Sequence, residues 1–309
     1  SINDGEICCA VLDTNDNDRQ KLLDTGVGIP VIATSKDRVG ADYLKMYGNK
    51  GVREWMPESP ALLKESMKDG ASQMRPKSRL AFMDIVEDRT IRQLEVHIDK
   101  LFDKRDDAKI RVMVVSSLAG GTGSGLILPV ALYIKNFLNT RFQQSANICR
   151  GFFILPEVFY EVIRGQSERN NLKCNAYATL RELDAFLMKG DHTLPDKYAD
   201  TVKVEFPRVG SGEFEEYNVR PYDFCFLFDA QNTEGKKLND FNQYLDHAAN
   251  CIYSQSIGPM NKRSNSSEDN TIRELCAEQG RNRYAGAGSS MLIYPLADVK
   301  EYIALKWTQ

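Results

Sequence analysis

Five short apolar runs alternate with helical patterns along this chain. The runs fall at residues 7–12, 31–34, 110–116, 148–155 and 224–228, and they are continuous rather than alternating, as in strands covered on both faces. Helical patterns lie at 79–102, 126–142, 171–188 and 238–256. A strand followed by a helix, repeated several times, predicts an α/β fold with a doubly wound, mostly parallel sheet and helices on both faces.

Three polar segments interrupt this pattern. Residues 35–59 are rich in Gly, Lys and Asp, and residues 206–223 contain V-G-S-G-E-F-E-E, so both are expected to be surface loops or insertions. Residues 258–270 are polar and follow the last long helix, which makes them a candidate domain boundary. Beyond them the pattern predicts a helix at 271–279, a Gly-rich strand at 285–294 and a helix at 296–307. We therefore expect one domain over residues 1–258 and the start of a second domain over 259–309.

Charge and cysteine usage narrow the class of protein. The 43 acidic and 40 basic residues give a net charge of -3 without long blocks of one sign, so nucleic acid is not an expected partner. Seven cysteines include no C-x-x-C pair, and the three histidines do not stand at metal-ligand spacing, so we expect no protein side chains that ligate a metal. The longest apolar stretch, 126–134, is too short to span a membrane, and no signal peptide is visible. The expected location is therefore a reducing cytoplasm.

A glycine-rich turn, S-L-A-G-G-T-G-S-G at residues 117–125, joins the apolar run 110–116 to the helix predicted from residue 126. Strand, glycine turn and helix form an arrangement that binds phosphate, because glycines let the backbone approach an anion and the first free N–H groups of the helix point at it. The turn is neither a Walker loop, which ends in Gly-Lys-Ser/Thr, nor the dinucleotide fingerprint G-x-G-x-x-G. The alternative is a turn that only packs a helix tightly on a sheet.

This turn resembles the signature G-G-G-T-G-S-G of tubulin and of the bacterial division protein FtsZ. Ala119 takes the place of the first glycine, and six residues match, namely Gly120, Gly121, Thr122, Gly123, Ser124 and Gly125. The resemblance implies a tubulin-type nucleotide-binding domain that holds GTP or GDP together with Mg²⁺. A bulky residue at Gly123 is then expected to abolish binding by blocking the approach of the backbone to the phosphates.

Other segments follow in the order of the same family, although each is also compatible with an ordinary turn. V-L-D-T-N-D at 11–16 resembles the family's acidic loop near the phosphates and Mg²⁺, which implies roles for Asp13 and Thr14. D-G-A-S-Q at 69–73 resembles its γ-phosphate loop, represented by Gly70, Ala71, Ser72 and Gln73. The ribose-contacting loop is represented by Glu157, Glu168, Arg169 and Asn175. The run A-Y-A-T-L-R-E-L-D that follows resembles most closely the bacterial tubulin-like branch.

The helix predicted at 238–256 resembles the central helix of the family, whose first turns contact guanine. A carboxylate accepts hydrogen bonds from both N1–H and the exocyclic amine of guanine, a pattern that adenine does not offer. Asp246, or Asn242 one turn earlier on the same face, is therefore the expected base contact; the alternative for each is a solvated position on an amphipathic helix. Phe241 and Tyr244 either stack on the base or belong to the core.

Hydrolysis in this family uses a second subunit, and the resemblance implies the same here. Subunits stack head to tail, and the acidic loop after the central helix of one completes the nucleotide site of the next, so the expected partner is another copy of this chain in a filament. The matching acidic residues are Glu268, Asp269 and Glu274. Three function classes stay open: a polymerising GTPase, a nucleotide-binding scaffold that does not hydrolyse, and an unrelated α/β enzyme on a glycine turn. The spacing of the acidic residues differs from that of the family, which would suit the scaffold.

One part of the family pattern has no counterpart in these residues. The family begins with a strand and a glycine-rich loop before the strand represented here by 7–12, where this sequence has only residues 1–6. The first phosphate loop either precedes this sequence or is supplied differently.

Overall fold

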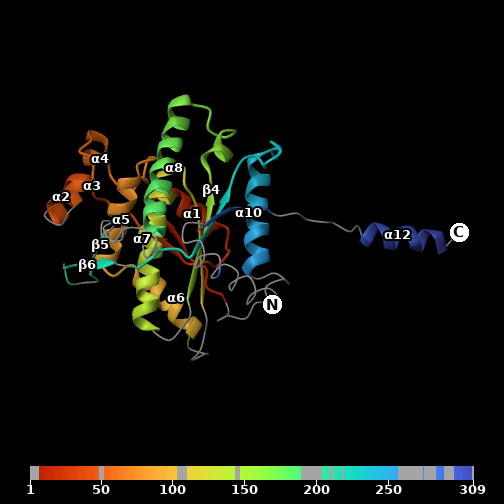
Figure 1. Cartoon of the computed structure of the whole chain (residues 1–309), viewed down its shortest axis with the longest axis horizontal. Helices are drawn as coiled ribbons and strands as arrows, with labels where there is room; N and C mark the ends of the chain where they lie inside the picture. Colours follow the sequence, from red (N-terminus) through yellow and green to blue (C-terminus); the bar gives the residue numbers. More distant parts are fainter. Residues whose placement is uncertain are drawn as a thin grey trace.

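The computed structural model describes residues 7–48, 52–102, 110–142, 147–188, 204–208, 211, 213–217, 219–256, 274, 283–288 and 296–307. Most of these residues form an α/β body (Figure 1). Helix α12 (Leu296–Trp307), at the C-terminal end, lies away from this body and confirms the helix predicted at 296–307. The domain boundary expected near residue 258 falls outside the described residues and stays a prediction.

A four-stranded parallel sheet forms the centre of the body. Its strands stand in the order β3 (Arg111–Ser117), β4 (Ile148–Ile154), β7 (Phe224–Phe228) and β8 (Tyr284–Gly286). Helix α7 (Gly121–Arg141) connects β3 to β4, and helix α8 (Gln166–Leu187) follows β4, because parallel strands need such crossovers. All four strands point the same way, so their carboxyl ends lie at one edge of the sheet.

Side chains of β4 alternate between the two faces of this sheet. Phe153 belongs to the main core together with residues of α7 and α8, whereas Phe152 packs with Ala248 and Cys251 of α10 (Phe241–Ser256). Helices α7 and α8 therefore cover one face and α10 covers the other (Figure 1). The doubly wound α/β architecture predicted from the sequence is confirmed.

A second parallel pair precedes this sheet in the chain. Strands β1 (Val11–Asp13) and β2 (Val31–Ala33) are joined by α1 (Asp16–Asp24). The side chain of Asn15 caps α1 by accepting hydrogen bonds from the backbone N–H groups of Asn17 and Asp18. Strand β1 therefore includes only the last two residues of the apolar run at 7–12 and extends one residue beyond it, to Asp13.

The segment 35–59 is not a surface loop, so that prediction is wrong. It contains α2 (Gly40–Tyr47) and α3 (Arg53–Trp55) and leads into α4 (Pro60–Lys64). Tyr43 and Tyr47 are buried, one helical turn apart, and the Tyr43 hydroxyl donates to Asp84 Oδ2 over 3.2 Å. The glycines and charged residues of the segment suggested a loop, but its apolar residues form part of the main core.

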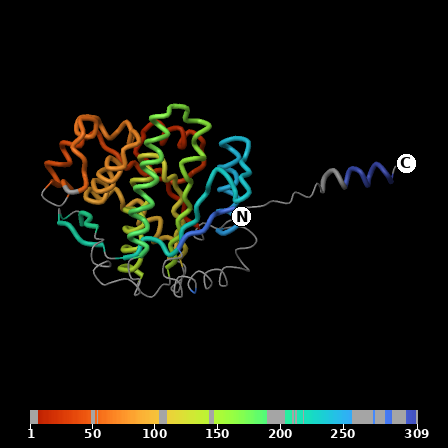
Figure 2. The backbone as a smooth tube through the Cα atoms, turned by 45° about the horizontal axis from the view of Figure 1, so that its top comes forward, coloured from red at the N-terminus to blue at the C-terminus, as the bar shows by residue number. Residues whose placement is uncertain are grey.

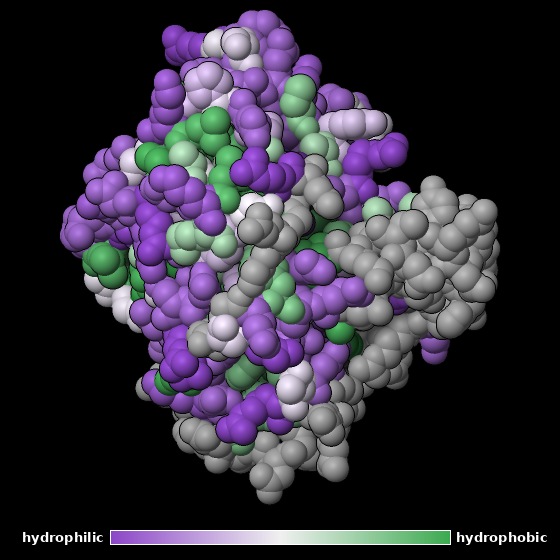
Figure 3. Space-filling view, turned by 90° about the vertical axis from the view of Figure 1, so that its left-hand side faces the viewer, coloured by the Kyte–Doolittle hydropathy of each residue, from purple (hydrophilic) through white to green (hydrophobic). Residues whose placement is uncertain are grey.

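The segment 206–223 was also expected to be a loop, and part of it is a hairpin. Strands β5 (Val204–Pro207) and β6 (Phe214–Tyr217) pair in antiparallel fashion. Phe206 packs against Phe82 with ring centroids 5.8 Å apart, and Phe214 packs against Tyr47 at 5.9 Å. The hairpin therefore lies beside the helices of the N-terminal third (Figure 2). The face that carries α2 to α4 is mostly hydrophilic with scattered apolar areas (Figure 3).

Several helix boundaries also differ from the sequence pattern: α8 begins at Gln166 rather than at 171, and α10 begins at Phe241 rather than at 238. The single helix expected at 79–102 is two helices, α5 (Arg75–Glu87) and α6 (Arg92–Phe102). Arg89 adopts φ 70° between them, and the Asp88 carboxylate accepts from the backbone N–H of Thr90 over 2.8 Å, which ends the first helix in a turn. Helix α7 begins at Gly121 rather than at 126, because three glycines of the turn take helical backbone angles.

Candidate phosphate-binding site

The glycine turn lies at the carboxyl end of β3 and runs directly into α7. The backbone N–H of Ala119 donates to Ser117 Oγ over 3.0 Å, and Gly120 is the N-cap of α7 with φ -78° and ψ 166°. No side chain caps this helix, so the N–H groups of its first turn are available to an acceptor. Because the macrodipole of a long helix makes this end positive, the acceptor that fits best is an anion.

The glycines of the turn differ in what surrounds them. A Cβ atom added to Gly121 would lie 2.7 Å from Met74 N, one on Gly123 would lie 2.6 Å from Ser117 O, and one on Gly125 would lie 2.6 Å from Arg75 O. A Cβ on Gly120 would meet no atom within 4 Å. Gly121, Gly123 and Gly125 therefore allow α7 to pack against β3 and the start of α5, while Gly120 alone faces open space.

The expected role of Gly123 needs correction. From the sequence, a bulky residue there was expected to block the approach of the backbone to the phosphates. The structure places the missing side chain of Gly123 against Ser116 and Ser117 of β3, on the protein side of the turn. The position that tests anion approach is Gly120.

The loop after β1 meets the glycine turn through two hydroxyls. Thr14 Oγ1 and Thr122 Oγ1 lie 2.6 Å apart and share a hydrogen bond. Thr14 is buried, and its carbonyl oxygen accepts from Ser35 Oγ over 2.5 Å. The Asp13 carboxylate accepts from the backbone N–H of Asn15 over 3.0 Å, which holds the loop in a tight turn. Thr14 and Asp13, both predicted from the sequence, thus reach the same edge as the glycine turn.

The loop at 69–73 has an unusual backbone. Gly70 has φ 98°, and the two non-glycine residues Ser72 and Gln73 have φ 48° and φ 60°. Such angles are uncommon for non-glycine residues and recur at ligand-binding and switch segments. An antiparallel bridge between Asn15 and Asp69 holds this loop next to the loop after β1. The three loops predicted to surround the phosphates are therefore neighbours.

Asn175 of α8 forms hydrogen bonds with both the loop at 69–73 and the glycine turn. Its Nδ2 donates to the carbonyl oxygens of Gln73 over 2.9 Å and of Ala119 over 3.0 Å. The ribose contact expected from the sequence for Asn175 stays a prediction, and the structure shows that its amide hydrogens hold the backbone of the two loops. Ser78 was not predicted from the sequence, and its hydroxyl donates to Gly121 O over 3.0 Å. Only the contact between α5 and α7 reveals this role.

Replacing Asn175 with aspartate should destabilise the protein. The carboxylate would face the carbonyl oxygens of Gln73 and Ala119 with no hydrogen to donate, so we expect a loss of about 2 kcal/mol or more in the free energy of unfolding. Urea denaturation measures this loss. Asn171→Asp, at an exposed position of the same helix, is the matched control and should change stability by less than about 0.5 kcal/mol. Equal stability of the two variants would contradict the role of Asn175.

The loop after β4 holds the other predicted ribose contacts. Arg169 donates through Nε to Ile163 O over 2.6 Å and through Nη2 to Tyr160 O, and its guanidinium lies 5.2 Å from the centre of the Tyr160 ring. These contacts fold the loop back on α8. Glu157, on the 3-10 helix η2 (Pro156–Phe159), and Glu168, in the first turn of α8, are exposed. Arg169 therefore shapes the loop, and the two carboxylates face solvent.

Helix α10 turns different residues to the core and to solvent. The Tyr244 hydroxyl donates to Ala230 O over 2.6 Å, and the Phe241 ring lies 5.3 Å from that of Phe159. Tyr244 is buried and belongs to the core, whereas Phe241 is partly buried and packs against the same cluster. Stacking of Phe241 on the base stays a prediction. Asn242 and Asp246 lie on the exposed face of α10.

The predicted catalytic carboxylates fall mostly outside the described residues. Glu268 and Asp269 lie outside them, and Glu274 is described only as an exposed helical residue.

In the described part of the chain, no group of three or more His, Cys, Asp or Glu side chains has the geometry of a metal site. The described cysteines are free thiols. No described helix is long and apolar enough to cross a membrane.

Comparisons with known proteins find one matching family and distant structural neighbours. A family model described as "Tubulin like" matches residues 14–309. No curated protein matches. Two archaeal structures resemble the fold: CetZ2 from Haloferax volcanii, in a GTPγS-bound protofilament, and CetZ from Methanosaeta thermophila strain DSM 6194.

The structural similarity is distant and partial. Each neighbour has 14% sequence identity and a TM-score of 0.38, and the alignments cover 86% and 90% of this chain. The chain spans only 53% and 61% of the length of these two proteins, so their ligands and assemblies are not thereby properties of this chain. The bacterial origin expected from the sequence stays a prediction. Because the family model covers residues 14–309, which is nearly the whole chain, the chain belongs to the tubulin-like family.

Proposed function

We propose that this chain is the nucleotide-binding part of a cytoplasmic, tubulin-like GTPase that binds GTP or GDP with Mg²⁺ and assembles head to tail into filaments. The observation that carries the proposal is the uncapped N-terminus of α7 directly after the glycine turn. The hydroxyls of Thr14 and Thr122 lie beside it at the carboxyl edge of the sheet. An α/β sheet binds ligands at this edge.

The donor set fits the phosphates of a nucleotide. Backbone N–H groups of the first turn of α7 would donate to phosphate oxygens, and the open space at Gly120 leaves room for them. Mg²⁺ is usually held by one or two carboxylates together with the phosphates, so a dedicated protein cage is not required. The loop after β1, with Asp13 and the Thr14 hydroxyl, would lie next to this ion and the phosphates. When bound, Mg²⁺ neutralises charge on the phosphates.

Guanine recognition is proposed for the exposed face of α10, through Asp246 or Asn242. Replacing the residue that contacts the base with alanine should cost roughly 2 to 4 kcal/mol of GTP binding, because the base edge loses charge-assisted hydrogen bonds. Competition titration of labelled GDP with GTP and ATP measures this loss for Asp246→Ala and Asn242→Ala.

Asn250→Ala, on the same helix and also exposed, is the matched control and should bind GTP like the unmodified protein. The variant that loses GTP affinity should gain no preference for ATP. If both Asp246→Ala and Asn242→Ala keep full affinity, the base does not lie on α10.

GTP turnover should depend on assembly. The proposed acidic loop of one subunit would place a carboxylate of Glu268, Asp269 or Glu274 at the nucleotide of the next, where it orients or deprotonates the attacking water. Because head-to-tail contacts of this kind do not close on themselves, they form filaments. Phosphate release per molecule should therefore rise with protein concentration, as a phosphate assay on a dilution series measures.

The double variant Glu268→Ala and Asp269→Ala should lose turnover and keep GTP affinity. Glu274→Ala, tested beside it, shows whether this third carboxylate takes part. Turnover that is flat across dilution, or that survives in the double variant, would contradict activation by assembly. A protein that binds GTP without turnover at any concentration would be the non-hydrolysing scaffold.

A further inference from the structure

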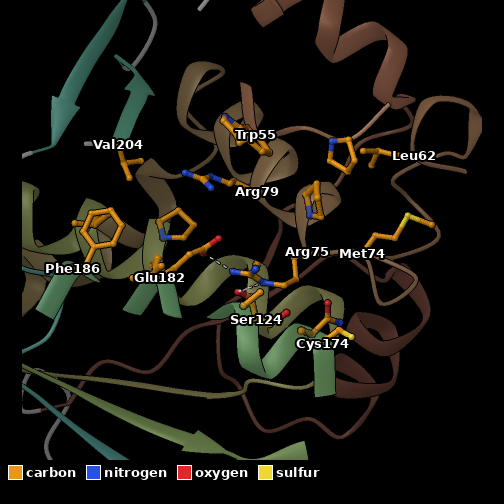
Figure 4. Close-up of a pocket in the computed structure, with 18 of the residues that line it drawn as sticks. Trp55, Leu62, Met74, Arg75, Arg79, Ser124, Cys174, Glu182, Phe186 and Val204 are labelled. Carbon is orange, nitrogen blue, oxygen red and sulfur yellow. Dashed lines mark hydrogen bonds and ion pairs between the residues drawn. The ribbon is translucent and has the colours of Figure 1, made fainter. Parts of the chain in front are cut away.

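A cavity lies beside the end of the glycine turn, and Ser124 and Gly125 of the turn contribute to its lining. It has a volume of about 570 Å³ and is enclosed by α5, α7 and α8, with α3, α4 and β5 along its rim (Figure 4). Its walls are mainly apolar, with Trp55, Leu62, Leu128, Phe186 and Val204 among them. The volume is in the range of pockets that bind small organic molecules, roughly 300 to 1,000 Å³.

This cavity is distinct from the proposed phosphate site. Thr14 and the segment Gly120 to Gly123 do not contribute to its lining. Asn175 does line it, but its amide is engaged by the carbonyl oxygens of Gln73 and Ala119. The cavity therefore adjoins the first turns of α5 and α7 from the side of α8.

Three charged side chains line the cavity, and their charges sum to one net positive charge. Arg75 Nη2 and Glu182 Oε2 form an ion pair over 2.5 Å. Arg79 lies over the Trp55 ring, 4.5 Å from its centre (Figure 4), and within the described residues its guanidinium has no hydrogen bond or ion pair. Two arginines and one glutamate leave one positive charge without a matching carboxylate.

The partly buried guanidinium of Arg79 has lost some of its contact with water without gaining a carboxylate of the described residues in exchange. Burial lowers the pKa of the Arg79 guanidinium, Glu182 opposes this effect and Arg75 adds to it, so its surroundings disfavour the positive form. The stacking on Trp55 covers one face of the guanidinium and leaves its N–H edge to other partners. Guanidinium binds carboxylate through two parallel hydrogen bonds, a pairing that would remove the imbalance.

We propose that this cavity binds a small amphipathic carboxylate. Its carboxylate group would pair with Arg79, and its apolar chain would lie against the walls that include Leu128 and Phe186. Arg79 and the apolar walls line the same cavity, so one molecule can pair with the guanidinium and also cover the apolar surface. A neutral molecule of the same shape would fill the apolar part and leave Arg79 unpaired.

The protein carries its own reporter for this cavity. Trp55 and Trp307 are the two tryptophans of the chain, and Trp307 lies in α12, exposed and away from the body. In a Trp307→Phe protein, emission therefore reports on Trp55 alone. Titration with octanoate should change this emission in a saturable way, and octanoate should bind about tenfold or more tightly than 1-octanol, which has the same chain without the charge.

Two variants locate the binding. Arg79→Gln should remove the preference for octanoate over 1-octanol, whereas Arg79→Lys, which keeps the positive charge, should retain part of it. Ala178→Phe places a ring into the cavity and should abolish the response to both ligands. A cooperative thermal unfolding transition shows that each variant is folded. If Arg79→Gln does not fold, Ala178→Phe and the comparison of octanoate with 1-octanol in the unmodified cavity still test the proposal.

A chemical probe gives an independent readout. Cys174 lines the cavity and is exposed to reagents, as is Cys9, which does not line it. Octanoate should slow the reaction of iodoacetamide with Cys174 and leave that with Cys9 unchanged. Equal affinity for octanoate and 1-octanol, an unaltered response in Ala178→Phe, or no effect on either Trp55 or Cys174 would overturn the proposal.

Discussion

Replacing Gly120 with valine should abolish nucleotide binding and leave the fold intact. The backbone angles of Gly120 suit valine, and a side chain there would meet no protein atom, so the folded protein tolerates it. The same open space is where phosphate would approach the first turn of α7. Hydrogen bonds to a charged group contribute about 1.5 to 3 kcal/mol each, so the loss of two lowers affinity roughly 100-fold or more.

Fluorescence titration with a labelled GDP measures the affinity of Gly120→Val, and thermal unfolding gives its stability. Gly120→Ala is the intermediate step, and it should weaken binding less than valine does. If Gly120→Val binds GDP as tightly as the unmodified protein, the phosphates do not lie at this turn.

The converse result is expected for Gly123→Val, which should destabilise the protein by about 3 kcal/mol. A Cβ atom there would lie 2.6 Å from the backbone oxygen of Ser117, which moves only if β3 or α7 shifts. Overpacking of this kind costs up to about 3 kcal/mol, and backbone atoms relieve it less readily than side chains do. Urea denaturation measures the change.

Gly123→Ala separates the steric cause from helix propensity. Alanine is favoured over glycine in a helix by about 1 kcal/mol, so a loss of stability in this variant arises from the contact with β3. Gly120→Ala is the matched control outside the helix. Gly123→Ala with unchanged or increased stability would show that the turn tolerates a side chain at both positions.

The sequence was sufficient to predict the glycine turn and its flanking elements. Strand, turn and helix depend on residues that are adjacent in the chain, and the apolar run before Ser117 and the glycines after Ala119 are visible without any structure. Thr14 was predicted from its place in the family order, and it does share a hydrogen bond with Thr122. Local pattern and segment order therefore bring most of the candidate site together.

Contacts between distant segments were not predictable in the same way. The separate roles of Gly120 and Gly123 depend on what lies across from each, which only the packing of α7 on β3 determines. Asn175 bonds to backbone atoms 102 and 56 residues away in the chain. Composition also misled for Tyr43, because the polar residues around it suggested a loop while its ring lies in the core.

The central claim is that guanine nucleotide binds at the turn before α7, and calorimetric titration of the purified chain with GTPγS and ATPγS tests it most directly. We expect saturable binding of one GTPγS per chain, no comparable binding of ATPγS, and loss of the GTPγS signal in Gly120→Val. Absence of GTPγS binding, equal binding of ATPγS, or full GTPγS binding by Gly120→Val would contradict the claim.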